Sequence, residues 1–306
     1  MSTERMNETV SGILCVNKPE GMTSHDVVYK IRRLYGTSKA GHTGTLDPMA
    51  SGVLVVLVGR AVKASEYLLA DKKEYIATLK LGQTTDTLDT TGKTVTCYTG
   101  VLPDTEAVKA VVPCFTGEIM QTPPMYSAIK TGGKKLYELA RKGEEIEREA
   151  RKVTIHSIEY LSPGHNYGEH VLKIVCSKGT YIRSLCDDIG RALGCGAVMS
   201  GLIRTGNGAF NIYDSYTIAT LSVLTEAERF SVLLPVESAF TAYRKIVLPD
   251  FFARLAECGN EIYLSKLRIS LEPDELVTLY RDNRFFALGQ VRIFPDGPAI
   301  KPIKQF

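Results

Sequence analysis

The chain has no CxxC pair, no HExxH motif and no apolar run near the ~20 residues that cross a bilayer. Its seven cysteines are odd in number and scattered, which argues against a disulfide framework or a zinc site. The five histidines show no metal-ligand spacing, so we expect no metal. The N-terminus is polar and carries two glutamates, unlike a secretory or transit peptide. These absences predict a cytoplasmic protein without membrane contact.

Strong charge of one sign is also missing. The 306 residues carry a net charge of only +3, too little for a general polyanion binder. The positive charge is concentrated in two stretches. Residues 130–152 hold eight Lys/Arg against five Glu, and residues 18–42 hold five against two acids. This distribution suits a polyanion of defined shape, although solvated helix faces with Glu/Lys pairs would account for part of it.

The most informative stretch is GHTGTLDPMASGVL at residues 41–54, which presents Asp47 on a loop. Gly41 and Gly44 permit backbone angles that other residues avoid, and Pro48 biases Asp47 toward an extended conformation. The following GVLVVLV has the character of a buried strand. A carboxylate on such a loop is a candidate catalytic group, and the alternative is an aspartate that only closes a turn.

Periodicity predicts alternating strands and helices through the first 240 residues. We expect strands at 12–19, 52–58, 73–82, 152–160 and 170–177, and short strands through 202–210. Helices are expected from Thr23 or Ser24 to about Tyr35, from the end of strand 52–58 to about Leu69, from Asp104, over 179–194, and near 218–228. TTDTLDTTG at 84–92 is rich in turn residues.

Two segments differ from this pattern. Residues 121–149 contain Pro-Pro, Gly-Gly and many charges with few core-forming residues, which indicates a mobile basic excursion that could close over a ligand. Residues 244–306 are expected to form short strands separated by turns, a small β-rich appendage.

Five motifs in order resemble the TruB family of tRNA pseudouridine synthases, which isomerise uridine 55 in the tRNA T-loop. They are GHTGTLDPMASGVL, KEYIATLKLG, QTPPMYSAIK, GTYIRSLCDDIG and LIRTGNGAF, and the resemblance runs from about residue 12 to 240. The C-terminal segment is similar to the family's PUA-like domain only in size, position and strand character. The chain also has Ile203 where the family often has a basic residue.

The resemblance implies three catalytic residues. Asp47 would be the catalytic carboxylate, acting on the sugar or on the base, and Tyr75 would stack on the extruded uracil. Arg183 would pair with Asp47 and favour its charged form. From the residues alone, strand packing is favoured for Tyr75 and a solvated helical arginine for Arg183. The isomerisation carries no electron or group away, so no cofactor is expected.

Further contacts follow from the same resemblance. His42 would touch the RNA near the flipped nucleotide, Tyr181 and Leu202 would line the substrate pocket, and Lys18 would touch phosphate or brace the loop. Locally, Leu202 is indistinguishable from core and His42 from a surface histidine. The 121–150 excursion matches the family's thumb, with phosphate contacts expected from Lys130, Lys134, Lys135, Arg141 and Lys142.

We therefore predict an α+β fold: a central mixed, mainly antiparallel sheet flanked by helices, with a small C-terminal β-rich PUA-like domain. The predicted division is a catalytic domain at 1–243, including the thumb at 121–150, and an RNA-binding domain at 244–306. The expected partner is the tRNA T-stem-loop, without guide RNA, bound by a monomer. Two alternatives stay open: a noncatalytic tRNA-binding protein or folding chaperone, and a guide-RNA-dependent synthase with a related core.

Overall fold

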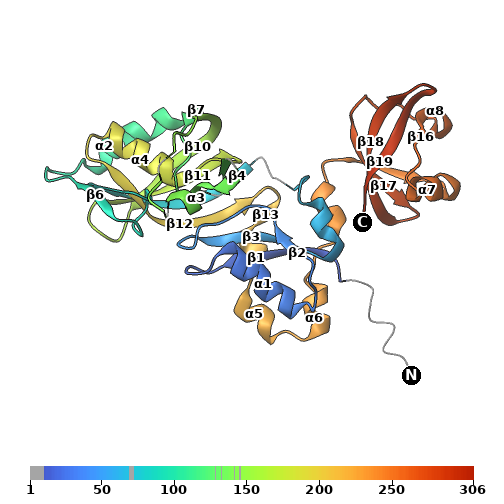
Figure 1. Ribbon diagram of the computed structural model, residues 1–306, viewed down its shortest axis with the longest axis horizontal. Coiled ribbons are helices and arrows are strands. Elements are labelled where there is room, and N and C mark those ends of the chain that lie inside the picture. Colours follow the sequence, from blue (N-terminus) through green and yellow to red (C-terminus); the bar gives the residue numbers. More distant parts are fainter. Residues whose placement is uncertain (1–9, 69–71, 128, 132, 141, 145) are drawn as a thin grey trace.

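The computed structural model describes residues 10–68, 72–127, 129–131, 133–140, 142–144 and 146–306. A large sheet spans the first part of the chain, with strand order β14-β1-β3-β12-β4-β11-β10-β7 and with β2 and β13 attached to β3 and β12 (Figure 1). Among the described pairs of this sheet, only β1–β14 and β3–β12 are parallel, which confirms a mixed, mainly antiparallel sheet. Its strands are β1 (Gly12–Lys18), β2 (Ala40–His42), β3 (Ser51–Val58), β4 (Lys72–Leu81), β7 (Gly117–Gln121), β10 (Arg151–Pro163), β11 (Glu169–Ser177), β12 (Ala197–Asn207), β13 (Phe210–Asn211) and β14 (Tyr216–Thr217).

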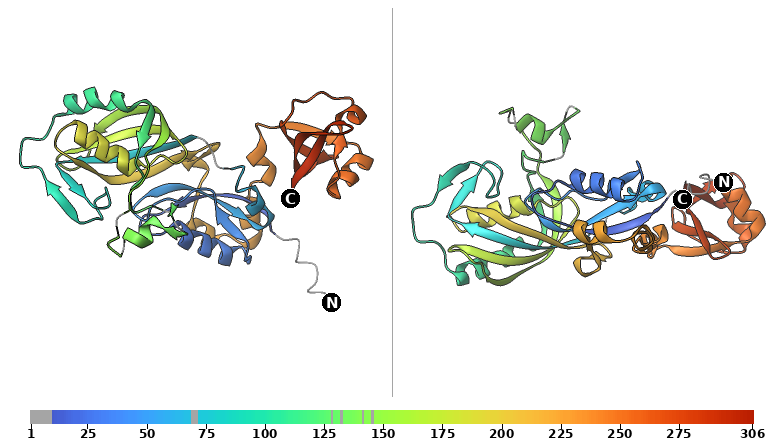
Figure 2. Two further views of the ribbon diagram at one scale, coloured as in Figure 1. Left: turned by 45° about the horizontal axis from the view of Figure 1, so that its top comes forward. Right: turned by 90° about the horizontal axis from the view of Figure 1, so that it is seen from below.

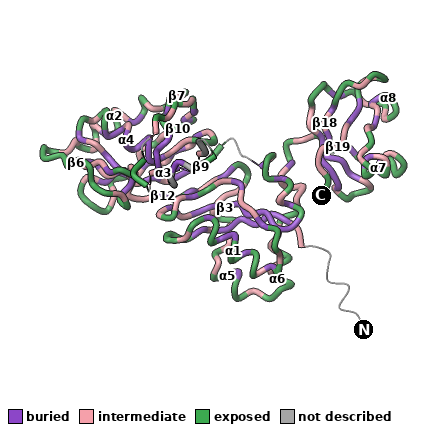
Figure 3. Tube along the Cα trace, in the orientation of Figure 1, coloured by how far each residue is buried: buried purple, intermediate pink, exposed green. Residues whose placement is uncertain are grey.

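The sheet is buried on both faces at β3, as its continuous apolar sequence requires. Leu54 and Val56 belong to one hydrophobic cluster, while Val53 and Val55 belong to another on the opposite face. The buried residues follow the central strands, and the exposed ones follow the loops and outer helix faces (Figure 3). Gly52 allows β3 to approach β12 closely, because a Cβ there would lie 2.2 Å from the Arg204 carbonyl oxygen.

Helices pack on both halves of this sheet, with α1 against β2 and β3 and α4 against β12 and β4. α1 begins with a capping box in which Thr23 and Asp26 satisfy each other's backbone amides, and its buried face carries Val27, Val28 and Ile31. α4 buries Ile182, Leu185 and Ile189 as its sequence pattern predicts. The helices of this part are α1 (Ser24–Leu34), α2 (Thr105–Val111), α4 (Ile182–Ala192), α5 (Ile218–Val223), α6 (Glu226–Ser231) and the 3₁₀ turns η1 (Gly59–Ala64), η2 (Val112–Phe115), η3 (Ile212–Asp214) and η4 (Val236–Phe240).

Several expected elements differ from the observed ones. The helix expected to reach Leu69 is the 3₁₀ turn η1, and Leu69 lies outside the described residues. The helix near 218–228 is two helices, each capped by a threonine, with extended backbone at Leu224 between them. The short strands expected at 202–210 are mostly one central strand, β12, which begins earlier because residues 197–199 are also fully buried.

The thumb (121–150) projects from one face of the sheet (Figure 2). It contains β8 (Lys130–Thr131), β9 (Lys134–Lys135) and α3 (Leu136–Ala140), and Leu136 and Leu139 are buried. It therefore has a small apolar centre that its charged composition conceals. Arg141 lies outside the described residues, as do the side chains of Lys130, Lys134 and Lys135, whereas Lys142 is exposed. A second, two-stranded ribbon is formed by β5 (Gln83–Thr85) and β6 (Thr94–Cys97).

The C-terminal region forms its own five-stranded sheet, in the order β15-β17-β18-β19-β16, with its own apolar cluster (Figure 1). The region is β-rich as predicted, and two helices that the sequence pattern did not predict also pack on its sheet. Its elements are β15 (Arg244–Leu248), α7 (Asp250–Glu257), β16 (Ile262–Tyr263), α8 (Leu264–Leu267), β17 (Leu276–Arg281), β18 (Arg284–Phe294) and β19 (Gly297–Gln305).

Phe240 joins the two parts of the chain. Its ring lies 6.1 Å from Tyr67 on one side and 5.8 and 5.5 Å from Phe285 and Phe306 on the other. Lys304 adds an ion pair with Glu66, at 2.6 Å. Among the described helices, none is long and apolar enough to cross a membrane.

Candidate active site

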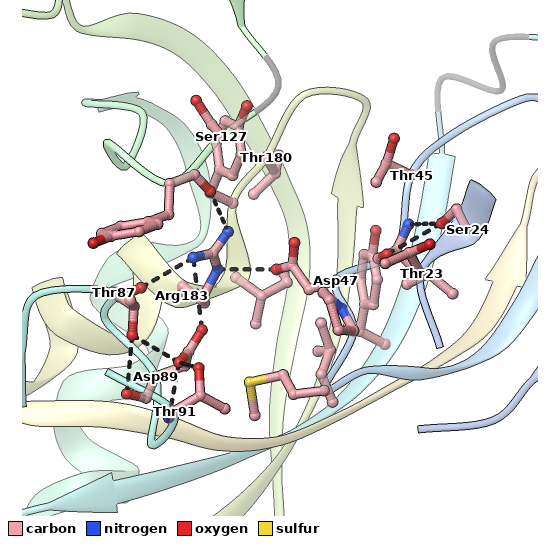
Figure 4. Close-up of a pocket in the computed structure, with 18 of the residues that line it drawn as sticks. Thr23, Ser24, Thr45, Asp47, Thr87, Asp89, Thr91, Ser127, Thr180 and Arg183 are labelled. Atoms are coloured by element: carbon pink, nitrogen blue, oxygen red, sulfur yellow. Dashed lines mark hydrogen bonds and ion pairs between the residues drawn. The ribbon is translucent and has the colours of Figure 1, made fainter. Parts of the chain in front are cut away.

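Asp47 lies on the loop between β2 and β3. The Ala50 amide donates to the Asp47 carbonyl at 3.0 Å, so this residue does close a turn through its backbone. Its side chain is left free to point into a cavity (Figure 4). Ser24 holds the loop from α1, because its hydroxyl donates to the Leu46 carbonyl and accepts from the Leu46 amide. Ser24 therefore braces the loop, while Thr23 caps the helix.

Lys18 is fully buried beside this loop. Its ammonium donates to the carbonyls of Pro19 at 2.9 Å, Met22 at 2.8 Å and Pro48 at 3.4 Å. Burial lowers the pKa of Lys18 to about 8, and the charge of Asp47 opposes that shift. The Pro48 contact braces the Asp47 loop, which is one of the two roles expected for this residue, and the Pro19 and Met22 contacts hold the connection between β1 and α1.

Arg204 anchors the loop from β12 and is also fully buried. Its Nε donates to the Val53 carbonyl at 2.7 Å, and its terminal nitrogens donate to the carbonyls of Gly44 at 3.1 Å and Thr45 at 3.4 Å. The sequence reasoning gave Arg204 no site role. Its motif, LIRT, was the available signal, but nothing in one sequence says that its guanidinium turns inward.

Arg183 faces Asp47 from the first turn of α4. Its Nε lies 2.9 Å from Asp47 Oδ2, and only 5% of the Arg183 side chain is exposed. The remaining nitrogens donate to the carbonyls of Thr87 at 3.0 Å and Tyr126 at 2.9 Å. Arg183 is thus a buried, fully used guanidinium, and its interpretation as a solvated helical arginine is wrong.

Asp89 is a second carboxylate in the site that sequence reasoning missed. It is 4% exposed, and its Oδ2 lies 3.6 Å from Arg183. The other oxygen accepts from the Thr87 hydroxyl at 2.7 Å and from the Thr91 amide at 3.0 Å. The segment 84–92 looked like a plain turn, because burial of a carboxylate in a polar loop leaves no trace in composition.

Enclosure in the cavity raises the pKa of the Asp47 carboxyl above its ordinary value. The Arg183 guanidinium opposes this most strongly, Asp89 adds to it, and Lys18 opposes it more weakly. Arg183 therefore does favour the charged form of Asp47, as expected, but desolvation outweighs it. A carboxyl with a raised pKa in a cleft is typical of a functional group.

The cavity around Asp47 has a volume of about 860 Å³. Tyr75 from β4 and Leu202 from β12 line it, each 6% exposed, and both also belong to the main hydrophobic cluster. Tyr75 and Leu202 thus pack in the hydrophobic core and line the cavity at the same time. Burial raises the pKa of the Tyr75 phenol, so this group stays protonated at neutral pH. Tyr181, the residue before α4, lines the same cavity.

Two histidines lie together beside the loop. His25 lines the cavity, and its ring centroid lies 5.8 Å from that of His42. His42 Nδ1 accepts a hydrogen bond from the Gly44 amide at 3.3 Å. Burial, His25 and Arg204 lower the pKa of His42 to about 4, so its ring is neutral at pH 7. The contact of His42 with RNA stays a prediction, and His25 is an addition that sequence reasoning missed.

The bracing role of Lys18 is testable with Lys18→Met. We expect the free energy of unfolding to fall by about 1–3 kcal/mol, because buried carbonyls lose their donor. The salt dependence of RNA binding should stay unchanged, since no phosphate contact is removed. Thermal denaturation and binding at several salt concentrations measure the two effects. A flatter salt dependence with unchanged stability would instead assign Lys18 to phosphate.

Two family models match the chain. Residues 32–182 match the N-terminal domain of TruB family pseudouridylate synthases, and residues 183–241 match the C-terminal domain of tRNA pseudouridylate synthase B. The tRNA pseudouridine synthase B of Clostridium kluyveri is 44% identical over 93% of this chain and 97% of its own. That of Bacillus licheniformis is 46% identical over 81% of this chain and 82% of its own.

The chain belongs to the TruB family of pseudouridylate synthases. As a TruB family enzyme it is an isomerase that forms pseudouridine in tRNA. Its fold is similar to solved structures described as a Cbf5-Nop10-Gar1 complex, with a TM-score of 0.69 and 27% identity, covering 96% of this chain and 84% of that one. A second, an H/ACA RNP bound to a substrate RNA containing 2′-deoxyuridine, has the same TM-score and 25% identity, and covers 96% of this chain and 84% of that one.

Proposed function

We propose that this TruB family enzyme converts uridine 55 in the tRNA T-loop to pseudouridine, with Asp47 as the catalytic carboxylate. The observation that carries this proposal is the pair formed at 2.9 Å by the buried Arg183 and the half-buried Asp47, in a cavity lined by Tyr75 and Leu202. The reaction breaks the C1′–N1 bond, turns the uracil and rejoins it through C5. The leaving and entering atoms belong to one base, so atoms and electrons balance without a cofactor.

The cavity suits an extruded nucleotide. Its volume lies within the roughly 300–1,000 Å³ that ligand pockets usually have. The target uridine must leave its stack, because its C1′ and C5 are otherwise out of reach of a side chain. Tyr75 supplies an aromatic face for the uracil and a protonated phenol, and Asp47 acts as nucleophile or stabilises positive charge at C1′.

The supporting residues take the following roles. Arg183 orients Asp47, Lys18 braces its loop, Tyr181 and Leu202 shape the pocket, and His42 contacts RNA beside the flipped nucleotide. The lysines of the thumb contact phosphates of the T-arm. We place the division between catalytic and RNA-binding domains at residues 243 and 244, just before β15, on the strength of the separate C-terminal core.

The enzyme acts alone in this proposal, as a monomer and without guide RNA. The solved neighbours described as complexes favour the alternative, a synthase that works within an assembly. Against it stands the identity of 44–46% with proteins named tRNA pseudouridine synthase B over most of both chains. A noncatalytic tRNA-binding protein or chaperone is disfavoured, because Asp47, Tyr75 and Arg183 line one cavity.

The test uses an unmodified T-arm stem-loop labelled with tritium at uracil C5. We expect the purified protein alone to release the label at the position of uridine 55, because C5 loses its proton to solvent when it bonds C1′, while N1 takes up a proton. A stem-loop with cytidine at that position is the control. No release without guide RNA would overturn the stand-alone activity, and release from another uridine would overturn the T-loop assignment.

A further inference from the structure

The base of the thumb is bound to the segment that carries Arg183. The thumb leaves the sheet after Gln121, the last residue of β7, and returns at Arg151, the first residue of β10. These two residues are register partners across the β7–β10 pair. Both contact the turn formed by residues 179–181, which immediately precedes α4.

Gln121 holds this turn by a reciprocal pair of hydrogen bonds. The Tyr181 amide donates to Gln121 Oε1 at 2.7 Å, and Gln121 Nε2 donates to the Tyr181 carbonyl at 3.0 Å. Gln121 is 1% exposed, so water does not compete for these bonds. Tyr181 is the N-cap of α4 but makes no side-chain cap bond, and the Gln121 carboxamide takes up its backbone groups instead.

Arg151 grips the same turn from the returning strand. One terminal nitrogen donates to the Gly179 carbonyl at 2.8 Å. The centre of the guanidinium lies 5.1 Å from the centroid of the Tyr181 ring, within the range of a cation–π contact. The ring that lines the substrate cavity is therefore set by the residue at the end of the thumb.

The segment that follows Gln121 into the thumb adds two further hydrogen bonds. The Ser184 hydroxyl donates to the Thr122 carbonyl at 3.2 Å, and Arg183 donates to the Tyr126 carbonyl at 2.9 Å. Arg183 also holds Asp47 at 2.9 Å (Figure 4). Contacts from Gln121 and Arg151 to residues 179–181, and from Thr122 and Tyr126 to the first turn of α4, thus converge on the segment that carries Arg183.

We propose that Gln121 and Arg151 are positioning residues that hold Tyr181 and Arg183 in place for the reaction. The Arg183–Asp47 pair is already formed at 2.9 Å, so these contacts keep the guanidinium against Asp47 and the Tyr181 ring at the cavity. The inference rests on the proposed roles of Asp47 and Arg183. A displacement of about 1 Å at such a pair is enough to cost on the order of a hundredfold in rate.

Gln121→Met tests the positioning role, because it keeps an unbranched side chain of similar length and removes both hydrogen bonds to the Tyr181 backbone. We expect kcat for the T-arm stem-loop to fall at least about tenfold, while the dissociation constant for that RNA changes less than about twofold. Tyr35→Phe is the matched control. It removes one bond from a buried side chain to a backbone carbonyl, Tyr35 to Arg229 at 2.8 Å, far along the chain from the thumb.

Arg151→Lys provides a second variant that keeps the charge, at a residue that is only partly buried. The double variant should lose less activity than the product of the two single losses, because both act on one turn. In these variants the acid limb of the pH profile of kcat should also move to higher pH. Asp47 faces Arg183, Asp89 and Lys18, and of these only Arg183 lies on the segment that Gln121 and Arg151 hold. A displaced Arg183 would lower the pKa of Asp47 less, so this pKa would rise.

Three results would overturn the positioning role. The first is a kcat of Gln121→Met within twofold of that of Tyr35→Phe, after correction for the fraction of folded protein. The others are a loss of RNA affinity equal to the loss of kcat, and strictly multiplicative effects in the Gln121→Met/Arg151→Lys double variant. Each is distinct from failure of the proposed function. That failure would show as wild-type protein that releases no label, whereas each of the three results is measured against an active wild type.

Discussion

Asp47→Asn should reduce turnover of the T-arm stem-loop at least about 10⁴-fold while leaving RNA affinity almost unchanged. Asparagine keeps the shape of the side chain but offers neither a nucleophile nor a negative charge to C1′. The loop should keep its conformation, because its anchors are Lys18, Ser24 and Arg204, none of which bonds the carboxylate. Single-turnover label release and filter binding measure the two quantities.

The control for this variant is Asp89→Asn, which removes the other carboxylate of the site. Asp89 also contacts Arg183, yet it lies behind the guanidinium and bonds Thr87 and Thr91. Its loss should therefore reduce kcat by less than the loss of Asp47. Equal activity of Asp47→Asn and wild type would remove Asp47 from the reaction.

Arg183→Met has the second largest expected effect, a loss of about 10²–10³-fold in kcat. It also leaves the buried Asp89 carboxylate without its cation, and removing one partner of such a buried ion pair costs about 3–5 kcal/mol of stability. Arg183→Lys is the matched variant. It keeps a charge but lacks the fork that serves Asp47 and the carbonyls of Thr87 and Tyr126, so it should recover only part of the activity.

The pH profile gives a sharper test of the same arrangement. In the proposed mechanism Asp47 acts in its ionised form, so activity should be lost as pH falls through its pKa, which lies above the ordinary 3.8. Removing Arg183 raises that pKa further, and the acid limb should move to higher pH. Asp89→Asn removes a neighbouring negative charge and should move the limb to lower pH. Shifts in one direction for both variants would contradict the electrostatic assignment.

Much of the fold could be predicted from sequence because its elements have strong local patterns. β3 is continuously apolar, α4 has a regular buried stripe ended by Gly194, and α2 begins at its Asp104 cap. The errors fall where local pattern is weak. α7 was missed because its short apolar face alternates with charges, and β12 was split because Gly201 and Gly206 interrupt it.

The candidate site was predictable in part for a different reason. Asp47, Tyr75 and Arg183 were selected through motif resemblance, and they do line one cavity. Asp89 and Arg204 were not assigned, since each is a polar residue whose burial depends on contacts with distant parts of the chain. Arg204 is held by carbonyls about 150–160 positions away, a separation that no local pattern reports.

The anchored Asp47 loop has a consequence for the RNA. Three buried groups on β1, α1 and β12 hold it in place, so little of it is free to adapt to an incoming nucleotide. The substrate must then supply the whole rearrangement, including unstacking of its uridine. If T-loops are the substrate, as proposed, kcat/KM should rise as the free energy needed to unstack the target uridine falls. The enzyme would then discriminate among RNAs by the stability of their loops as well as by their sequence.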